Sequence, residues 1–443
     1  MTFSELCQAV EREMESDFLG GEPVSSDPVT LQKRAIIGYK AETDIMKRRI
    51  EQILESFRVS EVVGDSDIPK IPSWYENAVE AVFHEIWGLA GIAEWFGAEY
   101  AQSSSAKIIG ERIYFMKDGV MTLMPQTISG ERSAQLIRAL LLLSPEERLD
   151  SETHEIYMLD GTRVTVFRGG MVKKNQQAVI FRRYVIPIYS FEEQTARGTI
   201  PEDAVPLFED MVRIGYNVVF CGSVRSAKTT FLATWQSYED PTLEGVLVET
   251  DPEIPMHTLM PDAPVVQIIA DGDKLAGISK SLMRSDADYF ILAEARDGIA
   301  LDTAVRIARK GTRRMKMTYH CHDPLAFSQD AAAEIVRSLG GNTAEIALRI
   351  ADSFDYVFHF ANIRPGNRKR LRGIYELDVE EDLSADSRRI AMHEVCRYLP
   401  SEDDWRWMYH LGDEKREAGY EADAEALMSF DQRLRALSER SLS

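Results

Sequence analysis

The spacing of hydrophobic residues separates two kinds of pattern along the chain. Before about residue 70 the sequence is charged, and Ile50, Ile53, Leu54 and Phe57 recur at the spacing of an amphipathic helix. After about residue 200, short apolar runs such as NVVFC, GVLVE and YFILAEA alternate with helix-like segments. Strands that alternate with helices are typical of an α/β domain with a mainly parallel sheet.

The segment between these two parts is predicted to be a small α+β domain. The dipeptides Asp118-Gly119 and Asp160-Gly161 each lie between two strand-like runs, as in β-hairpins. A helix-like segment, LIRALLLLSPEER, separates the two hairpins. Upstream, GGEPVSSDP and VVGDSDIPKIPS interrupt the helical pattern, and their composition predicts linkers.

These patterns predict four parts. They are a helical N-terminal extension over residues 1–70, an α+β N-terminal domain over 75–195, an α/β domain over 200–380 and a helical C-terminal tail over 381–443. We expect the tail, which includes SEDDWRWMYHLGDEKREAG, to be polar and helical. Its tryptophans are expected to pack against the body of the protein, because buried aromatic side chains contribute large apolar areas.

Charge and cysteine content narrow the function classes. The net charge of −21 leaves no excess of Lys and Arg for a phosphate backbone, so we expect no direct nucleic-acid partner. The four cysteines form no CxxC pair, which fits a reducing cytoplasm better than a disulfide scaffold or a four-cysteine zinc site. The N-terminus lacks the pattern of a signal peptide, and the apolar run ALLLL is too short to span a bilayer. Membrane association would therefore need a partner or a surface.

The segment VVFCGSVRSAKTTFLATW is close to the pattern of a phosphate-binding loop. Gly222, Lys228 and Thr229 are in register, but Ala227 stands where the pattern has its second glycine. Such a loop joins a buried strand to a helix, so backbone N–H groups and the helix N-terminus face the phosphates. An ordinary strand-to-helix turn that carries a lysine is the alternative. The residues predicted to bind nucleotide in this loop are Gly222, Ser223, Ser226, Ala227, Lys228, Thr229 and Thr230.

Alanine at position 227 leaves the main features of the loop in place. It removes neither the N–H donors nor Lys228 nor Thr229. If the position is left-handed, alanine costs roughly 1–2 kcal/mol. We therefore expect a slow ATPase rather than a lost nucleotide site.

Polar side chains follow three further strand-like runs. Glu294 ends the run YFILAEA, Glu249 and Glu253 lie in VLVETDPEI, and His320 follows MTY. Because parallel strands end at one edge of a sheet, we expect these residues to meet Lys228 there. A carboxylate at this place can orient or deprotonate an attacking water. The sequence HCH from His320 also resembles a metal motif, but no second ligand pair at zinc spacing follows it.

Together these motifs resemble the secretion ATPase superfamily that powers type II and type IV secretion and type IV pili. VLVETDPEI is similar to the acidic box of that family, SLMRSDADYFILAEARD to its Walker B segment and MTYHCHDP to its histidine box, in the order of the family. Upstream, EIWGLAGIAEWF, LDGTRVTVF and AVIFRRY resemble the N-terminal domain of Flp/Tad-type pilus assembly ATPases and their relatives in conjugation. The resemblance covers roughly residues 75–380 and implies a RecA-like P-loop motor domain over 200–380.

The resemblance implies a homo-hexameric ring that binds ATP and Mg²⁺, with Thr229 as the magnesium ligand and Lys228 on the β- and γ-phosphates. It implies a cytoplasmic location at the inner face of the cell membrane, next to an inner-membrane platform protein. It also implies arginines that face the nucleotide, for which surface ion pairing is the alternative. By position these are Arg163, Arg182, Arg284 and Arg296.

Three functions fit these observations. The first is an ATPase motor of a secretion, pilus assembly or conjugation machine. The second is a nucleotide-binding ring component with little or no turnover. The third, a small-molecule P-loop kinase, lacks a basic lid and leaves the N-terminal domain unexplained. The basic segment ARKGTRRMK is predicted either to be a solvated loop or to contact a channel or a neighbouring subunit.

Overall fold

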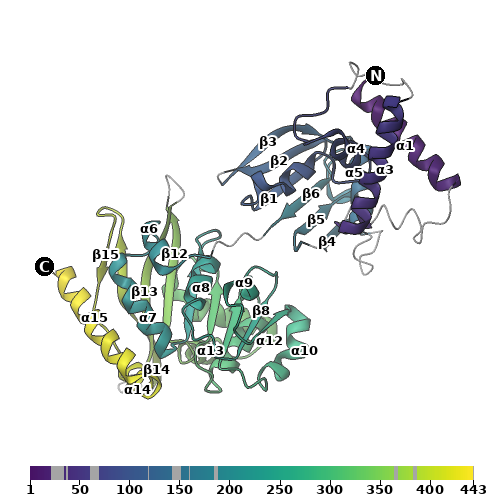
Figure 1. Cartoon of the computed structure of the whole chain (residues 1–443). Coiled ribbons are helices and arrows are strands. Elements are labelled where there is room, and N and C mark those ends of the chain that lie inside the picture. The colour runs from purple at the N-terminus through teal and green to yellow at the C-terminus, as the bar shows by residue number, and fades with distance from the viewer. Residues whose placement is uncertain are drawn as a thin grey trace. The chain divides into compact units, whose positions relative to one another are not determined.

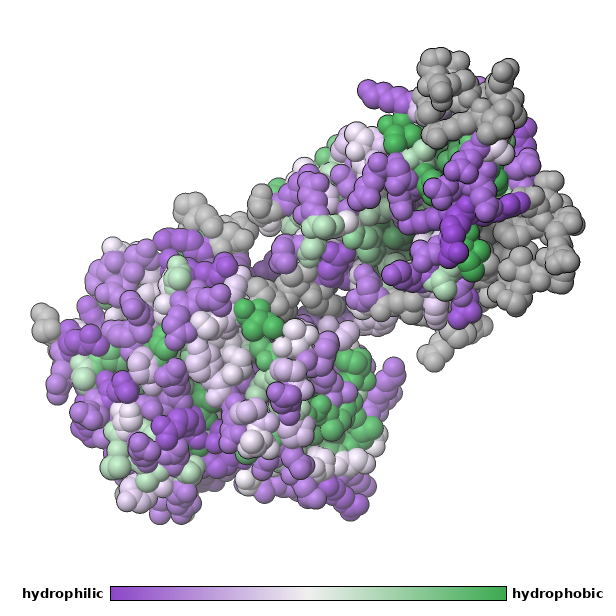
Figure 2. Space-filling model, in the orientation of Figure 1, coloured by the Kyte–Doolittle hydropathy of each residue, from purple (hydrophilic) through white to green (hydrophobic). Residues whose placement is uncertain are grey.

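The computed structural model describes residues 1–20, 34–35, 38–59, 69–117, 119–141, 151–158, 160–183, 188–363, 368–382 and 387–442. The chain forms two compact units, an N-terminal unit over Met1–Val185 and a C-terminal unit over Ile186–Ser443 (Figure 1). Most of the two predicted linkers lies outside the described residues. On the face drawn in Figure 2, hydrophilic residues cover most of the surface and hydrophobic ones form small separate areas.

The N-terminal unit combines helices with an antiparallel sheet. Leu6, Val10, Ile50 and Phe83 belong to one buried cluster that joins the helices α1 (Phe3–Gly20), α3 (Lys40–Val59) and α4 (Ala78–Ile86). The sheet has the order β3-β2-β1-β6-β5-β4, and α5 (Gly130–Leu141) lies between β3 and β4 in the sequence. Its strands are β1 (Ser105–Ile109), β2 (Arg112–Lys117), β3 (Val120–Thr127), β4 (Thr153–Tyr157), β5 (Arg163–Phe167) and β6 (Ala178–Arg182). Both predicted hairpins are confirmed, because β2 pairs with β3 and β4 with β5 in antiparallel register.

The C-terminal unit contains one mixed sheet of order β15-β14-β13-β12-β7-β11-β10-β8-β9. From β12 to β9 the neighbouring strands are parallel, and from β12 to β15 they are antiparallel. The parallel strands are β7 (Val218–Gly222), β8 (Gly245–Glu249), β9 (Val265–Ile269), β10 (Tyr289–Ala293), β11 (Lys316–Tyr319) and β12 (Tyr356–Ile363). We call the edge at which they end the C-terminal edge of the sheet.

Helices cover both faces of this sheet, which has a separate buried apolar cluster on each side. Strands β7 and β10 are buried along their whole length because both of their faces are covered, which explains their continuous apolar runs. The helices are α6 (Phe191–Ala196), α7 (Val205–Ile214), α8 (Lys228–Gln236), α9 (Met256–Leu259), α10 (Gly272–Leu282), α11 (Gly298–Ala308), α12 (Phe327–Leu339), α13 (Thr343–Ala351), α14 (Asp413–Ala422) and α15 (Ala424–Leu442).

The expectation of a helical tail over residues 381–443 is wrong for about its first half, because the first helix begins only at Asp413. Strands β13 (Arg368–Asp382), β14 (Ser387–Leu399) and β15 (Asp404–Trp407) extend the sheet before α14 and α15 begin (Figure 1). The tryptophans of this segment pack on the body as expected. Trp407 is buried in the core, and the indole N–H of Trp405 donates to the carbonyl of Leu371 at 2.7 Å.

Candidate functional site

The loop that joins β7 to α8 begins at a position that accepts only glycine. Gly222 has a φ of 141°, and it pairs with Phe360 of the neighbouring strand β12. A Cβ atom at Gly222 would lie 2.0 Å from the carbonyl oxygen of Phe360, well inside contact distance. The strand pairing thus forces a close backbone approach where the loop starts.

Ala227 directly precedes α8 and has the left-handed conformation, with φ 76° and ψ 21°. This is the conformation for which glycine is favoured and alanine costs roughly 1–2 kcal/mol. Its methyl side chain offers no cap to the first turn of α8. Alanine in place of the glycine of the pattern therefore strains the loop. The path of the loop and the N-terminus of α8 are kept.

The side chain of Lys228 is buried inside the loop. Its Nζ atom lies 3.1 Å from the carbonyl oxygen of Gly222, 2.8 Å from that of Ser223 and 3.2 Å from Nδ1 of His320. Burial lowers the pKa of Lys228, because the charged ammonium loses water. Three acceptors surround this ammonium at the start of α8.

Glu294 lies at the end of β10 between two basic side chains. Its Oε1 atom is 3.2 Å from Nε2 of His320, and its Oε2 atom is 2.5 Å from a guanidinium nitrogen of Arg296. Burial alone would raise the pKa of Glu294, but the hydrogen bonds from His320 and Arg296 lower it to about 2. Glu294 is thereby held as a carboxylate. His320 links it to Lys228, in the tautomer that carries the proton on Nε2.

Thr318 fixes the backbone of Glu294 and was not predicted as a site residue. Glu294 has a φ of 65°, and its N–H donates to Oγ1 of Thr318 at 2.8 Å. The N–H of Ala295 donates to the carbonyl of Thr318 at 3.0 Å. Thr318 lies on β11, two residues before His320, which directly follows the strand, so the period-two rule for strands could have placed both on the same face.

Glu249 and Glu253 bring two protonatable carboxyls to the same edge. Glu249 ends β8 opposite Ala293 of β10, and its Oε1 atom accepts the N–H groups of Glu253 and Ile254 at 3.0 and 2.9 Å. Burial raises the pKa of Glu249 to about 7. Burial and the nearby Glu294 carboxylate raise the pKa of Glu253 to about 7, against a hydrogen bond from Thr229.

The structure therefore brings most of the predicted residues of the C-terminal unit together. Lys228, Thr229, Glu249, Glu253, Glu294, His320 and Arg296 form one connected cluster at the C-terminal edge of the sheet. Buried Asp251, which was not predicted, lies 4.0 Å from Arg296 at the same edge. The Nδ1 atom of His320 faces Lys228 and its Nε2 atom faces Glu294, so both ring nitrogens have partners within the cluster. This arrangement differs from the metal motif that the sequence HCH suggested.

The other three predicted arginines lie elsewhere. Arg284 is exposed in the turn between α10 and β10, near the start of a strand whose far end carries Glu294. Arg163 and Arg182 belong to the N-terminal unit, where they are directly opposite each other on β5 and β6. Cross-strand partners share one face of a sheet, so these two guanidinium groups lie on the same face.

The basic segment ARKGTRRMK, residues 308–316, is solvated only in part, because some of its cations are buried or paired. Lys316 is fully buried and its Nζ atom lies 2.8 Å from Glu239, whose other carboxylate oxygen lies 2.6 Å from Arg314. Arg314 also donates to the carbonyl oxygens of Val212 and Arg213, both at 2.7 Å. These cations support the fold at the edge opposite Lys228.

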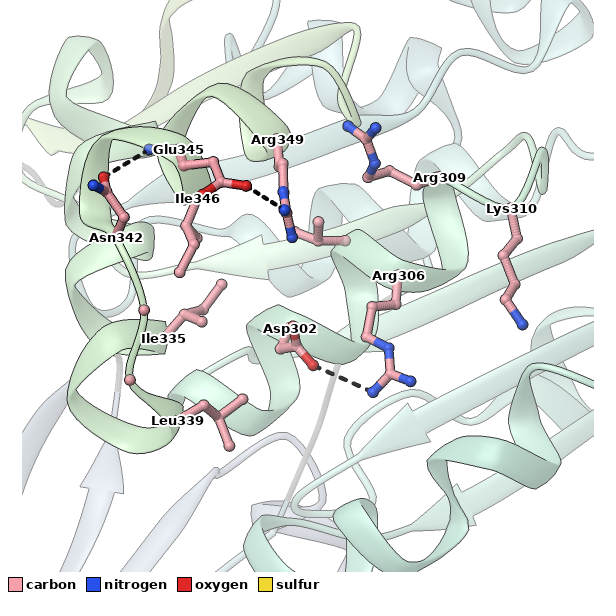
Figure 3. A pocket seen from close by; sticks show the side chains of 13 residues that line it. Asp302, Arg306, Arg309, Lys310, Ile335, Leu339, Asn342, Glu345, Ile346 and Arg349 are labelled. Atoms are coloured by element: carbon pink, nitrogen blue, oxygen red, sulfur yellow. Dashed lines mark hydrogen bonds and ion pairs between the residues drawn. The ribbon is translucent and has the colours of Figure 1, made fainter.

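A pocket of about 500 Å³ lies between the last turns of α11 and α12 and the start of α13 (Figure 3). Helix α11 follows β10 and leads back to the parallel strand β11, so its last turn lies away from the C-terminal edge. Within their helices Arg306 pairs with Asp302 and Arg349 with Glu345 (Figure 3). None of the predicted site residues lines this pocket.

Comparison with known proteins gives fold similarity alone. No family model and no curated protein match the chain. Among solved structures, the ATPase DotB of Legionella pneumophila is 15% identical, with a TM-score of 0.45 over 83% of this chain and 90% of that chain. DotB of Yersinia pseudotuberculosis is 13% identical, with a TM-score of 0.48 over 84% and 88%. The pilus retraction motor PilT with bound ADP is 14% identical, with a TM-score of 0.46 over 77% and 91%. At these values the similarity establishes neither a family nor a function.

Proposed function

We propose that this chain binds MgATP at the β7–α8 loop and hydrolyses it slowly as a RecA-like motor. The convergence of Lys228, Glu249, Glu294 and His320 at one sheet edge carries the proposal. These residues come from four separate strand ends, and a phosphate loop, acidic side chains and a histidine were expected there in this order along the chain. Ligands bind at this edge in open α/β sheets.

The polar groups of the loop fit a nucleotide phosphate. The ammonium of Lys228 is buried among backbone carbonyls that a phosphate could replace as its partner. The fully buried hydroxyl of Ser226 has no hydrogen-bond partner among the described residues. The N-terminus of α8, which begins at Lys228, adds positive potential beside both side chains.

Each side chain of the cluster has a definite task in this proposal. Lys228 would contact the β- and γ-phosphates, and Thr229, whose hydroxyl bonds to Glu253 in the free protein, would ligate Mg²⁺. Bound MgATP supplies the phosphoryl group that is transferred to water. Glu294, which His320 and Arg296 hold as a carboxylate, would orient the attacking water.

The wider role follows from the sequence resemblance. We propose a motor of a secretion, pilus assembly or conjugation machine, closest to the Flp/Tad type, that works as a homo-hexamer on an inner-membrane platform protein at the cytoplasmic face of the membrane. By the same resemblance, Arg163, Arg182 and Arg284 would face the nucleotide. Among the described residues, no helix is both long and apolar enough to cross a bilayer.

Phosphate release separates the motor from its alternative. The wild type and Glu294→Gln are compared at matched protein concentration with saturating MgATP. We expect measurable turnover in the wild type and at least about a tenfold loss in the variant, which corresponds to about 1.4 kcal/mol of barrier. ATP binding without turnover above Glu294→Gln would instead support a ring component that does not hydrolyse nucleotide.

The ring is tested separately by light scattering with and without a non-hydrolysable ATP analogue. We expect a mass of several chains when the analogue is present. A strictly monomeric mass under both conditions would contradict the hexamer and leave the nucleotide site untouched.

A further inference from the structure

A second polar cluster lies in the C-terminal unit, on strands that the sequence did not predict. It contains Asp378 of β13, His393 of β14 and His410, which follows β15. The pairing of β13 with β14 places Glu376 opposite His393, and the pairing of β12 with β13 places Glu376 opposite Tyr356.

This cluster is separate from the proposed nucleotide site. Tyr356 pairs with Val218 at the start of β7, whereas Phe360 pairs with Gly222 at its end. Four residues of strand rise about 13 Å. The cluster therefore belongs to the edge of the sheet opposite Lys228, and no residue is shared between the two.

Both imidazole rings direct the same nitrogen at one carboxylate oxygen. The Nε2 atom of His410 lies 3.1 Å from Oδ2 of Asp378, and the Nε2 atom of His393 lies 3.4 Å from the same oxygen. The two rings are stacked, with centroids 3.6 Å apart and planes 17° from parallel. Two imidazole nitrogens and one carboxylate oxygen thus lie within 4.8 Å of one another, close enough for small side-chain rotations to bring all three to a single ion.

Neighbouring groups hold these side chains in position. The Nζ atom of Lys415 donates to the other carboxylate oxygen of Asp378, Oδ1, at 2.8 Å and leaves Oδ2 facing the histidines. Buried Glu376 accepts the N–H of Gly412 at 2.7 Å and the hydroxyl of Tyr356 at 2.7 Å. Hydrogen bonds to the outer atoms of ligands are characteristic of metal sites.

We propose that Asp378, His393 and His410 bind a divalent transition-metal ion, with zinc as the best match. Ligand bonds of 2.0–2.1 Å in a tetrahedron place ligand atoms about 3.3 Å apart, close to the 3.1 and 3.4 Å observed here. Imidazole ligands favour zinc over magnesium or calcium, which prefer oxygen. Three protein ligands leave a fourth position for water or for Oε1 of Glu380, which lies 3.4 Å from Nε2 of His393.

Without an ion, the Nε2 atom of His410 is hydrogen-bonded to Asp378, and the Nε2 atom of His393 makes a longer contact with the same oxygen. Metal binding needs each neutral imidazole to present its Nε2 lone pair, so its proton moves to Nδ1. The ion would then tie β13 and β14 to the segment that leads into α14, and bind the C-terminal helices to the sheet. This proposal does not depend on the ATPase function.

Zinc titration of the chelator-treated full chain tests the site. We expect one zinc ion per chain in the wild type, bound more than about 100-fold more weakly by His393→Gln and by His410→Gln, since even outer-shell partners of a metal contribute 10–100-fold. His257→Gln, which changes an exposed histidine elsewhere, should bind as the wild type does. His320→Gln should also retain this zinc ion, because His320 belongs to the other edge of the sheet.

A measurement on the wild type alone covers the case in which a variant fails to fold. X-ray absorption of the zinc-loaded protein should show two imidazole nitrogens among about four light-atom ligands. The proposal is overturned if the wild type binds no zinc at micromolar concentration, if both histidine variants bind it unchanged, or if the absorption spectrum contains no histidine.

Discussion

Replacement of Ala227 by glycine should stabilise the protein, although most changes from alanine to glycine destabilise a helical protein. Ala227 has φ 76° and ψ 21° directly before Lys228, the first residue of α8. An L-residue with a Cβ atom pays for this left-handed conformation, and glycine does not.

The expected size follows from two opposing effects. Glycine relieves a strain of roughly 1–2 kcal/mol, and its greater freedom in the unfolded chain offsets roughly 0.5–1 kcal/mol of that. The difference is between about 0 and 1.5 kcal/mol, so we expect a gain of about 0.7 kcal/mol in the free energy of unfolding. Glycine is also a better N-cap than alanine, which acts in the same direction.

A matched control changes alanine to glycine at a right-handed position. Ala333 is exposed in the middle of α12, where the same substitution should destabilise by about 1 kcal/mol. Urea unfolding, followed by tryptophan fluorescence, to which buried Trp235 of α8 contributes, measures both variants against the wild type. The two midpoints should move in opposite directions. A loss of stability in Ala227→Gly as large as that in Ala333→Gly would refute the strain at this position.

Two further predictions concern the carboxyl groups of the site. Burial raises the pKa of Glu249 from its ordinary value of 4.5 to about 7, so the folded protein binds this proton more tightly than the unfolded chain does. The resulting contribution to the free energy of unfolding is fully present below about pH 4.5 and is lost as the pH rises through 7. Glu249→Gln should make the fall in unfolding free energy between pH 5 and 7 shallower by about 1.4 kcal/mol per pH unit, and an unchanged slope in urea titrations would contradict this. Thr318→Val removes the acceptor for the N–H of Glu294 and should lower kcat five- to tenfold, for a hydrogen bond of about 1 kcal/mol, with unchanged ATP affinity. Equal kcat in Thr318→Val and the exposed control Thr258→Val would show that Thr318 does not position Glu294.

The sequence was most informative where apolar runs end in polar residues. The runs before Gly222, Glu249 and Glu294 are buried strands, and their common direction brings the three ends together. The sequence can predict this from the short length of the continuous apolar runs and the turn or polar residues that end them, because strands covered on both faces have apolar residues throughout.

The strands of the C-terminal segment were missed for a physical reason. Strand β14 has Arg388 and Arg389 near its start and Glu394 and Arg397 further along, and these charged residues make the composition of the segment resemble that of a polar helix. An irregularity in register between Ile374 and Tyr375 also interrupts the period of two in the pairing of β13 with β14. Without those strands, no spacing rule brings Asp378, His393 and His410 together.

The proposed role of Arg163 and Arg182 rests on the family resemblance rather than on a pattern within the chain. The family resemblance implies that each of them faces the nucleotide, and the pairing of β5 with β6 places them opposite each other. Thr318, in contrast, acts by its hydroxyl on the backbone of another strand, which no linear motif records.

Equilibrium binding of MgATP tests the central claim most directly, and isothermal titration of the wild type, Lys228→Ala and Lys310→Ala provides the comparison. Lys310 is an exposed lysine that lines the pocket of Figure 3. We expect one nucleotide per chain in the wild type and in Lys310→Ala. Loss of a buried, hydrogen-bonded charge should weaken binding to Lys228→Ala by about 30-fold or more, or about 2 kcal/mol. An affinity for MgATP that is the same in Lys228→Ala and in the wild type would contradict the assignment of the β7–α8 loop as the nucleotide site.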